Sequence, residues 1–140
     1  MDFFRIIVGE CSVNKILTVH SRKAAEETLA ILQGFQGKVI LHWYTGDFKL
    51  LNEALERGYF FSINHQMLRS ANGRKVIDAL PADRILVETD APFTYGLKES
   101  YSSKPIMDVY NYLAMKYEVP IDKVMSKTKV NFKNVLSLND

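Results

Sequence analysis

The chain has few of the features that mark secreted or membrane proteins. Only one of its 140 residues is a cysteine, Cys11, which excludes an internal disulfide and is typical of a reducing compartment. Acidic residues at positions 2 and 10 interrupt the N-terminal segment, which argues against a signal peptide. No segment approaches the roughly 18 consecutive apolar residues of a membrane-spanning helix. These absences predict a cytoplasmic protein with no membrane partner.

The sequence also lacks a strong excess of either charge. A net charge of +2 does not by itself indicate nucleic-acid binding, although it is compatible with a local basic surface. With 47% hydrophobic and 24% charged residues, the composition is that of an ordinary soluble domain. The length suits one hydrophobic core, so we expect a single domain over residues 1–140.

Four apolar runs alternate with helical patterns along the chain. The runs are rich in Val, Ile and Leu without polar alternation, which predicts parallel strands covered on both faces. The expected strands are 15–20, 38–43, 59–64 and 84–90. The expected helices are 3–12, 23–33, 48–57, 67–79, 105–117 and 121–137, and a loop is expected over 93–103. The strand-end positions 20, 42, 64 and 90 are 22, 22 and 26 residues apart, a spacing typical of βα units. The sequence therefore predicts an α/β fold of four parallel βα units, half the number in a closed TIM barrel.

Three of the expected strands end in residues that commonly bind metal ions. His20 follows KILTV, His42 lies within KVILHWY, and Asp90 follows RILVET. The carboxyl ends of parallel strands converge at one end of a sheet, so we expect these side chains to meet there. Two imidazoles and a carboxylate suit a hydrolytic divalent metal centre. Taken alone, each histidine could equally end a strand with local hydrogen bonds, and Asp90 could cap the following turn.

Other residues near these strand ends are candidates for supporting roles. Glu88 lies two residues before Asp90, so an extended strand would point both carboxylates to one face. There Glu88 could orient a metal ligand or a water, or be a buried ion-pair partner. Arg22 follows Ser21, a natural helix N-cap, and is a candidate phosphate contact because helix starts favour anions. Trp43 could stack on nucleic-acid bases, although packing is the more common role of such a residue.

For five further residues, an ordinary structural role competes with a functional one. Lys23, beside the expected helix start, is better explained as solvated surface. Tyr44 and Phe93 could stack on bases but are more typical of packing. We expect His65 on the surface of a loop, and Cys11 inside the first helix with no feature of a nucleophile.

The segments VHSRKA, LHWYTG and ILVETDAPF, with KVNFKNVL near the C-terminus, together resemble the TatD family of metal-dependent deoxyribonucleases. ETDAP combined with the upstream H-S-R and H-x-x-x-G is more specific than any of these motifs alone. The resemblance covers nearly the whole chain and the C-terminal half of the family pattern, and it implies a TIM barrel that hydrolyses DNA. It also implies two divalent ions, Mg²⁺, Mn²⁺ or Zn²⁺. His20 and His42 match the two later histidine ligands of the family, and Asp90 matches its late aspartate ligand. The HWYTG form is most similar to TatD-like proteins of Qat antiphage-defence clusters.

The chain departs from the family pattern on its N-terminal side. The family pattern has an H-x-H pair on its first strand and a bridging glutamate in a G-E-x-G-L-D type motif on a middle strand. No H-x-H pair occurs here. Glu10 does not match the bridging glutamate, because it lies only ten residues before His20, too close for the helix that should separate two parallel strands, and no Gly-Leu-Asp follows it. We therefore expect the chain to begin inside the barrel, with Met1 an internal or misassigned start. We also expect it to be a poor or inactive nuclease on its own. Four strands leave two open sheet edges, which predicts a homodimer or association with a separate N-terminal half.

Within this resemblance, Asp90 is expected to bind metal and orient the attacking water, with Glu88 as the second catalytic carboxylate and DNA as the substrate. Two other functions stay open. The chain could be a non-catalytic remnant or subunit that binds nucleic acid or a defence-complex partner. It could also be a metal-dependent amidohydrolase that acts on a small amide or lactone.

Overall fold

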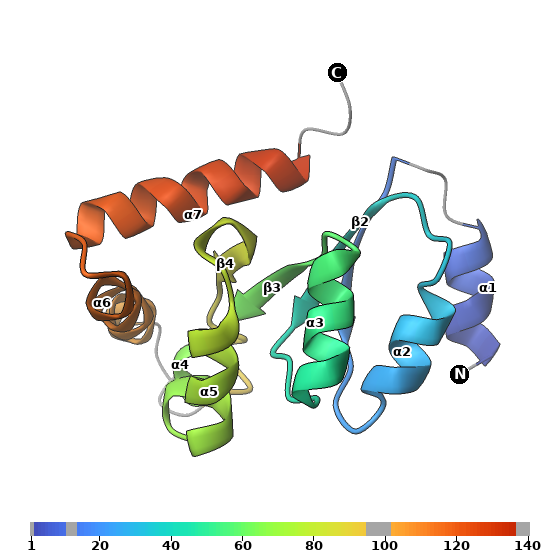
Figure 1. Cartoon of the computed structure of the whole chain (residues 1–140), viewed down its shortest axis with the longest axis horizontal. Coiled ribbons are helices and arrows are strands. Elements are labelled where there is room, and N and C mark those ends of the chain that lie inside the picture. Colours follow the sequence, from blue (N-terminus) through green and yellow to red (C-terminus); the bar gives the residue numbers. More distant parts are fainter. Residues whose placement is uncertain (1, 11–13, 95–101, 137–140) are drawn as a thin grey trace.

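Four parallel strands form one sheet in the order β1-β2-β3-β4, as the computed structural model shows (Figure 1). The structure describes residues 2–10, 14–94 and 102–136. The strands are β1 (Ile16–His20), β2 (Lys38–His42), β3 (Phe60–Ile63) and β4 (Ile85–Val87). The helices are α1 (Asp2–Glu10), α2 (Ala25–Ile31), α3 (Phe48–Glu56), α4 (His65–Leu68), α5 (Ala71–Ala79), the 3₁₀ helix η1 (Ala82–Arg84), α6 (Lys104–Tyr117) and α7 (Ile121–Leu136). The predicted alternation of parallel strands with helices is therefore confirmed.

Local side-chain chemistry explains where two of the helices begin. The Asp47 side chain accepts a hydrogen bond from the Leu50 amide at 2.9 Å and starts α3, as its place after Thr45-Gly46 predicts. Ser70 caps α5 by accepting from the Gly73 amide at 2.9 Å. The single helix predicted over 67–79 is therefore wrong, because the extended backbone at Ser70 separates α4 from α5.

The start of α2 also differs from the sequence prediction. Ser21 does not cap this helix; its side chain is buried, and its carbonyl accepts from the Ala24 amide at 3.0 Å in a turn. Lys23 adopts a left-handed backbone with φ of 56°, which interrupts helical geometry. The helix therefore begins two residues later than predicted, at Ala25, and spans seven residues.

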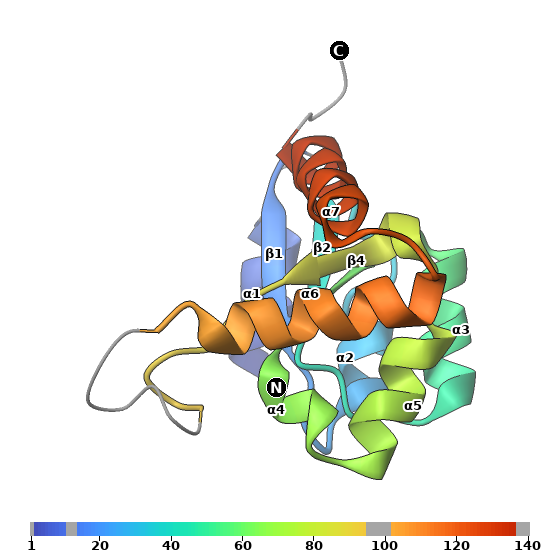
Figure 2. The same cartoon turned by 90° about the vertical axis from the view of Figure 1, so that its left-hand side faces the viewer.

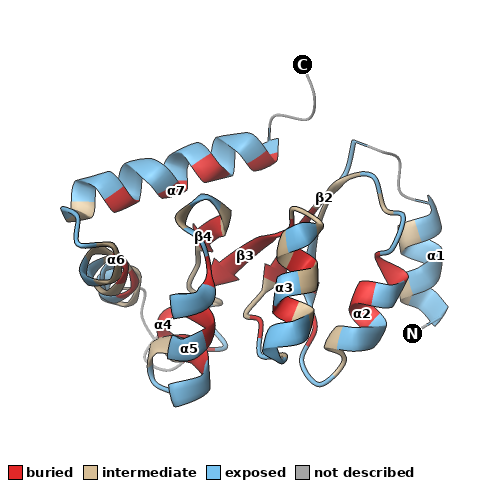
Figure 3. Cartoon of the chain, in the orientation of Figure 1, coloured by how far each residue is buried: buried red, intermediate tan, exposed pale blue. Residues whose placement is uncertain are grey.

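The two faces of the sheet are packed differently. One face contributes Val19, Leu41, Phe61 and Ile63 to the main core, which the helices cover (Figure 3). Figure 2 shows α2, α3 and α5 gathered on one side of the strands, with α7 across the top. The opposite face holds a smaller cluster of Ile40, Phe60, Leu86 and the α7 residue Val135. Alternate residues of each strand thus belong to separate cores.

Burial is also uneven along the sheet. Every residue of β3 is buried, whereas in β1 only Val19 is buried and Thr18 and His20 are exposed. Full covering of all four strands on both faces was therefore a wrong prediction for β1. The reason is topological, because β1 is an outer strand that pairs only with β2 among the described strands.

The two C-terminal helices hold the β4 side of the sheet. Asn131 of α7 is fully buried and donates from Nδ2 to the carbonyls of Ala82 and Ile85, at 2.7 and 2.8 Å. Lys116 of α6 donates from Nζ to the Ile77 carbonyl at 2.7 Å. Burial lowers the pKa of Lys116, an effect that the negative charge of nearby Asp78 opposes.

None of the helices in the described ranges combines the length and apolarity needed to cross a lipid bilayer.

Candidate functional site

Polar side chains gather at the carboxyl ends of the strands, on the face opposite the main core. The sheet register pairs His20 with His42 and His42 with Ser62, so these three residues lie in one row across β1, β2 and β3. Residues paired in a parallel register point to the same face. The rings of His20 and His42 have centroids 5.4 Å apart and planes inclined at 47°. The predicted convergence of these two imidazoles is therefore present.

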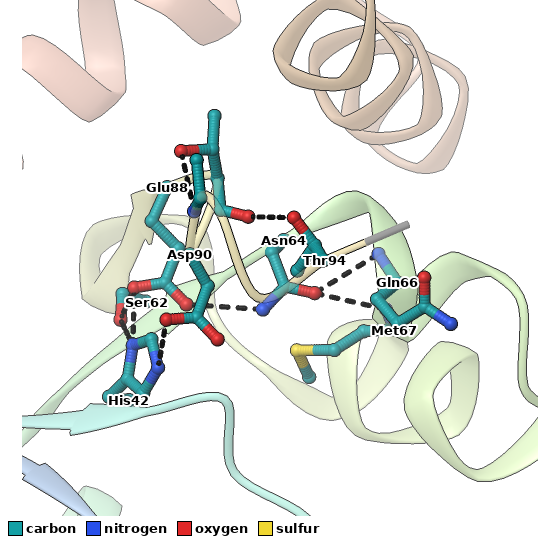
Figure 4. A network of polar contacts seen from close by, with 10 residues as sticks. His42, Ser62, Asn64, Gln66, Met67, Glu88, Asp90 and Thr94 are labelled. Atoms are coloured by element: carbon teal, nitrogen blue, oxygen red, sulfur yellow. Dashed lines mark hydrogen bonds and ion pairs between the residues drawn. The ribbon is translucent and has the colours of Figure 1, made fainter. Parts of the chain in front are cut away.

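Glu88 is the centre of a polar network at this end of the sheet (Figure 4). Its Oε2 lies 2.6 Å from Nδ1 of His42 and accepts a hydrogen bond from the Ser62 hydroxyl at 2.6 Å. Its Oε1 accepts from Nδ2 of Asn64 at 3.2 Å. Asn64 is completely buried, and its Oδ1 accepts from the Gln66 and Met67 amides at the start of α4. The carboxylate of Glu88 is thus held by three residues from two segments, the end of β2 and the end of β3.

Asp90 approaches the same histidine from the other side. Its Oδ1 lies 3.2 Å from Nε2 of His42, so both ring nitrogens of His42 face carboxylates (Figure 4). The extended strand predicted to reach Asp90 is wrong, because β4 ends at Val87 and Asp90 has a left-handed φ of 53°. Both carboxylates nevertheless meet at His42, because the chain turns after Glu88. The turn is held by the Thr94 hydroxyl, which donates to the Thr89 carbonyl at 2.7 Å.

Three non-glycine residues with left-handed backbones follow three of the strands. Lys23, Trp43 and Asp90 have φ values of 56°, 45° and 53°. Such conformations cost about 1–3 kcal/mol each and cluster at functional sites. The strain therefore marks the same end of the sheet that carries the polar network.

The residues predicted to touch substrate occupy different environments around this network. Arg22 is exposed in the turn after β1, directly beyond the strand end at His20. Trp43 is half-buried, packs against the main core, and donates its amide to the Ser62 carbonyl at 3.1 Å. Phe93 is 79% exposed. Arg22 and Phe93 therefore do not pack in the core, and the half-buried Trp43 leaves part of its side chain exposed to solvent.

Tyr44 belongs to the core. It is buried, its ring meets Phe61 edge-on with centroids 5.8 Å apart, and its hydroxyl donates to the Asp47 carbonyl at 2.8 Å. Burial, with a smaller contribution from the negative charges of Asp47 and Glu53, raises the pKa of Tyr44 well above its ordinary value. The packing role is confirmed for this aromatic residue.

His65 is buried rather than exposed on a loop, which corrects its predicted position. It is the first residue of α4, because Asn64 caps that helix directly at the end of β3 and α4 packs against α5 and α6. Cys11 and residues 95–101 of the expected loop lie outside the described residues.

The polar network fits a metal ion in donor type but not in donor number. Two donors that lie about 2.1 Å from an ion and about 100° apart are about 3.2 Å from each other. The separation of His42 Nε2 and Asp90 Oδ1, 3.2 Å, matches this. Across residues 2–10, 14–94 and 102–136, however, no group of three or more His, Cys, Asp and Glu side chains is arranged to hold a metal ion. The described residues thus supply a fitting pair of donors without a complete set.

Sequence reasoning overlooked Ser62. It lies within the apolar run YFFSIN, where a single hydroxyl resembles an ordinary strand residue. The spacing of the predicted strand ends aligned His42 with Asn64, 22 residues later, whereas the register of the folded sheet pairs His42 with Ser62, 20 residues later.

The comparisons with known proteins identify the family of this chain. The family model of the TatD related DNases matches residues 10–137 of the chain. The chain belongs to the TatD family. Among its relatives, the human protein named Deoxyribonuclease TATDN3 is 33% identical over 123 residues, which are 85% of this chain and 44% of the human protein. The Escherichia coli protein YcfH, named an uncharacterized metal-dependent hydrolase, is 30% identical over 138 residues, 91% of this chain and 51% of its own length.

A solved structure shows the same fold. The TatD family hydrolase from Entamoeba histolytica superposes with a TM-score of 0.75 at 16% identity, covering 96% of this chain and 55% of that protein. This likeness confirms the predicted α/β class of parallel βα units of a TatD-type TIM barrel. The chain spans about half the length of the curated relatives it matches.

Proposed function

We propose that the site at the carboxyl ends of the strands serves metal-dependent hydrolysis of DNA phosphodiester bonds. The observation that carries this proposal is His42, held between Glu88 at Nδ1 and Asp90 at Nε2. A carboxylate that accepts a hydrogen bond from one ring nitrogen fixes the tautomer and leaves the other nitrogen free to bind a metal. Glu88 accordingly positions His42, and the lone pair of Nε2 points to the space beside Asp90.

In this proposal His20, His42 and Asp90 are the metal ligands that the chain contributes. The carboxylate of Asp90 also lies beside the ion as a proton acceptor and orients the attacking water. A divalent ion, when bound there, supplies Lewis-acid stabilisation of the phosphate and a water of lowered pKa. Arg22, exposed next to His20, contacts a backbone phosphate, and Trp43 offers a ring face to a base.

The test is hydrolysis of an end-labelled DNA oligonucleotide by the purified chain in Mn²⁺, with and without EDTA. We expect slow turnover that EDTA abolishes and that falls at least about tenfold in His42→Ala and Asp90→Ala. The matched control is Asp122→Asn, an exposed carboxylate in the first turn of α7. Turnover that survives both His20→Ala and Asp90→Ala would reject the assignment of these residues.

A second candidate function is a non-catalytic subunit that binds DNA. The observation that favours it is the lack of three assembled metal donors among the described residues. DNA binding that EDTA leaves unchanged, together with no turnover in any divalent metal, is the result expected for this second function.

The open sheet edges support a related proposal about partners. In the described part of the chain, β1 pairs only with β2 and β4 only with β3. Unpaired strand edges are sites of association. We propose that these edges pair with further strands, either from another copy of the chain or from a segment that supplies further βα units.

A further inference from the structure

Asn64 joins the carboxylate of Glu88 to the start of α4 (Figure 4). Its Oδ1 accepts hydrogen bonds from the Gln66 and Met67 amides at 3.0 and 3.2 Å, and its Nδ2 donates to Oε1 of Glu88 at 3.2 Å. Capping a helix needs only the acceptor, which aspartate and serine supply about as well as asparagine. The helix start therefore explains the oxygen of Asn64 and leaves its NH₂ group for another role.

The backbone of α4 determines which atom of Asn64 faces Glu88. A backbone N–H can only donate, so the atom that meets the two amides has to be Oδ1. The NH₂ group of this fully buried side chain is then turned to Glu88, because exchanging the two ends of the amide would set donors against donors at α4. Asn64 thus presents a fixed donor to the carboxylate.

Donors of known direction meet both oxygens of Glu88. Oε1 accepts from Asn64, and Oε2 accepts from the Ser62 hydroxyl at 2.6 Å. Oε2 also lies 2.6 Å from Nδ1 of His42. An ionised carboxylate can only accept, so the hydrogen of this contact belongs to Nδ1. In a neutral ring, Nε2 then carries a lone pair and no hydrogen.

Asp90 competes for the same ring hydrogen from the other side. Its Oδ1 lies 3.2 Å from Nε2 of His42, against 2.6 Å between Glu88 and Nδ1. A ring that donated to Asp90 would turn the lone pair of Nδ1 against the carboxylate of Glu88. The choice between the two tautomers therefore depends on how firmly Glu88 is held beside Nδ1.

We propose that Asn64 is a positioning residue of the site, which fixes Glu88 from the start of α4 and thereby places the ring hydrogen of His42 on Nδ1. Because α4 packs against α5 and α6, the helical layer supports the orientation of the imidazole. Metal binding at the bare Nε2 rests on the proposed function, whereas the position of the ring hydrogen does not.

Exchanging the amide and the carboxylate tests this role. In Glu88→Gln, the oxygen of the new amide should turn to the fixed donor of Asn64, so that its NH₂ group meets His42. The ring hydrogen should then move to Nε2, because Nδ1 has to accept. When Asn64→Asp is added, the carboxylate at position 64 still caps α4 and accepts from the amide at position 88, whose oxygen again faces His42. The hydrogen should return to Nδ1.

The position of the hydrogen is measured by nitrogen–proton correlation NMR of the histidine rings, in the purified chain with EDTA at about pH 8, where an imidazole is ordinarily neutral. Ring nitrogens with and without a hydrogen have well-separated chemical shifts. The chain has three histidines, so His42→Ala identifies the signals of His42. Ser70→Ala is the control, because it removes the cap of α5 without touching Glu88 and should leave the hydrogen on Nδ1.

Three results would overturn the proposal: a hydrogen on Nε2 in the wild-type chain, an unchanged tautomer in Glu88→Gln, or no return to Nδ1 in the double variant. Asn64→Ser replaces these variants if they do not fold. It keeps an acceptor for α4 and removes the donor to Glu88, so both tautomers should be populated. Nδ1 as the only protonated nitrogen in Asn64→Ser would contradict the role of Asn64.

Binding of Mn²⁺ separates this inference from the proposed function. The affinity should fall roughly 10- to 100-fold in Glu88→Gln and recover in the double variant, measured by the fraction of free Mn²⁺ in electron paramagnetic resonance. A chain whose tautomers follow the expected order, but which binds no Mn²⁺ and cleaves no DNA, would keep Asn64 as a positioning residue and remove the proposed metal-dependent function.

Discussion

His42 and His20 are neighbours in the sheet register but occupy opposite environments. His42 is half-buried and held by carboxylates at both ring nitrogens, and these carboxylates are anchored by Ser62 and Asn64. His20 is exposed on the outer strand β1, where its ring meets only His42 among the contacts found in the described residues. The comparison shows that the β4 side of the site, which we call the rigid side, is fixed by contacts within the chain, whereas His20 on the β1 side contacts only the ring of His42 among the contacts found in the described residues.

The largest expected effect tests the rigid side through the helix that supports it. Asn131→Leu removes the amide that satisfies the carbonyls of Ala82 and Ile85, and leaves two carbonyls in or near the core without donors. We expect a loss of about 3 kcal/mol in the free energy of unfolding, measured by urea denaturation. Lys133→Ala, an exposed change on the same helix, is the control. A loss below about 1 kcal/mol would show that β4 does not depend on this contact.

A smaller effect is expected at the carboxylate that positions His42. Glu88→Gln replaces an acceptor-only group by an amide that must oppose the Ser62, Asn64 or His42 donors. We expect a loss of about 2 kcal/mol in unfolding free energy and a Mn²⁺ affinity roughly 10- to 100-fold weaker. Glu56→Gln on the exposed face of α3 should change neither quantity. Unchanged Mn²⁺ binding in Glu88→Gln would remove the positioning role.

The smallest effect is expected at His20, on the outer strand β1. His20→Ala truncates an exposed side chain outside the Glu88 network, so the unfolding free energy of the chain should change by no more than about 0.5 kcal/mol. Urea denaturation beside the Glu88→Gln variant measures the difference. A loss equal to that of Glu88→Gln would show that His20 contributes as much as Glu88 to the stability of the chain.

Several features of the fold and site could be predicted from residues alone. The apolar runs ending at His20 and His42 and the regular spacing between them predicted parallel strands, because a βα unit has a nearly constant length. The chemical type of the site followed from which residues stand at strand ends. The prediction failed where one residue changes the backbone direction, as at Lys23, Ser70 and Asp90.

The sequence by itself determined the parallel βα order, the TatD family and the residue types available for chemistry, since these depend on local pattern and motif. Only the tertiary structure decided that Ser62 and Asn64 donate hydrogen bonds to Glu88. It also decided that Glu88 and Asp90 contact opposite nitrogens of the His42 ring. These contacts join residues 24 to 48 positions apart, and their geometry depends on strand register and on a left-handed turn at Asp90. No local segment of the sequence determines the strand register or the backbone direction, because both are set when the strands pair.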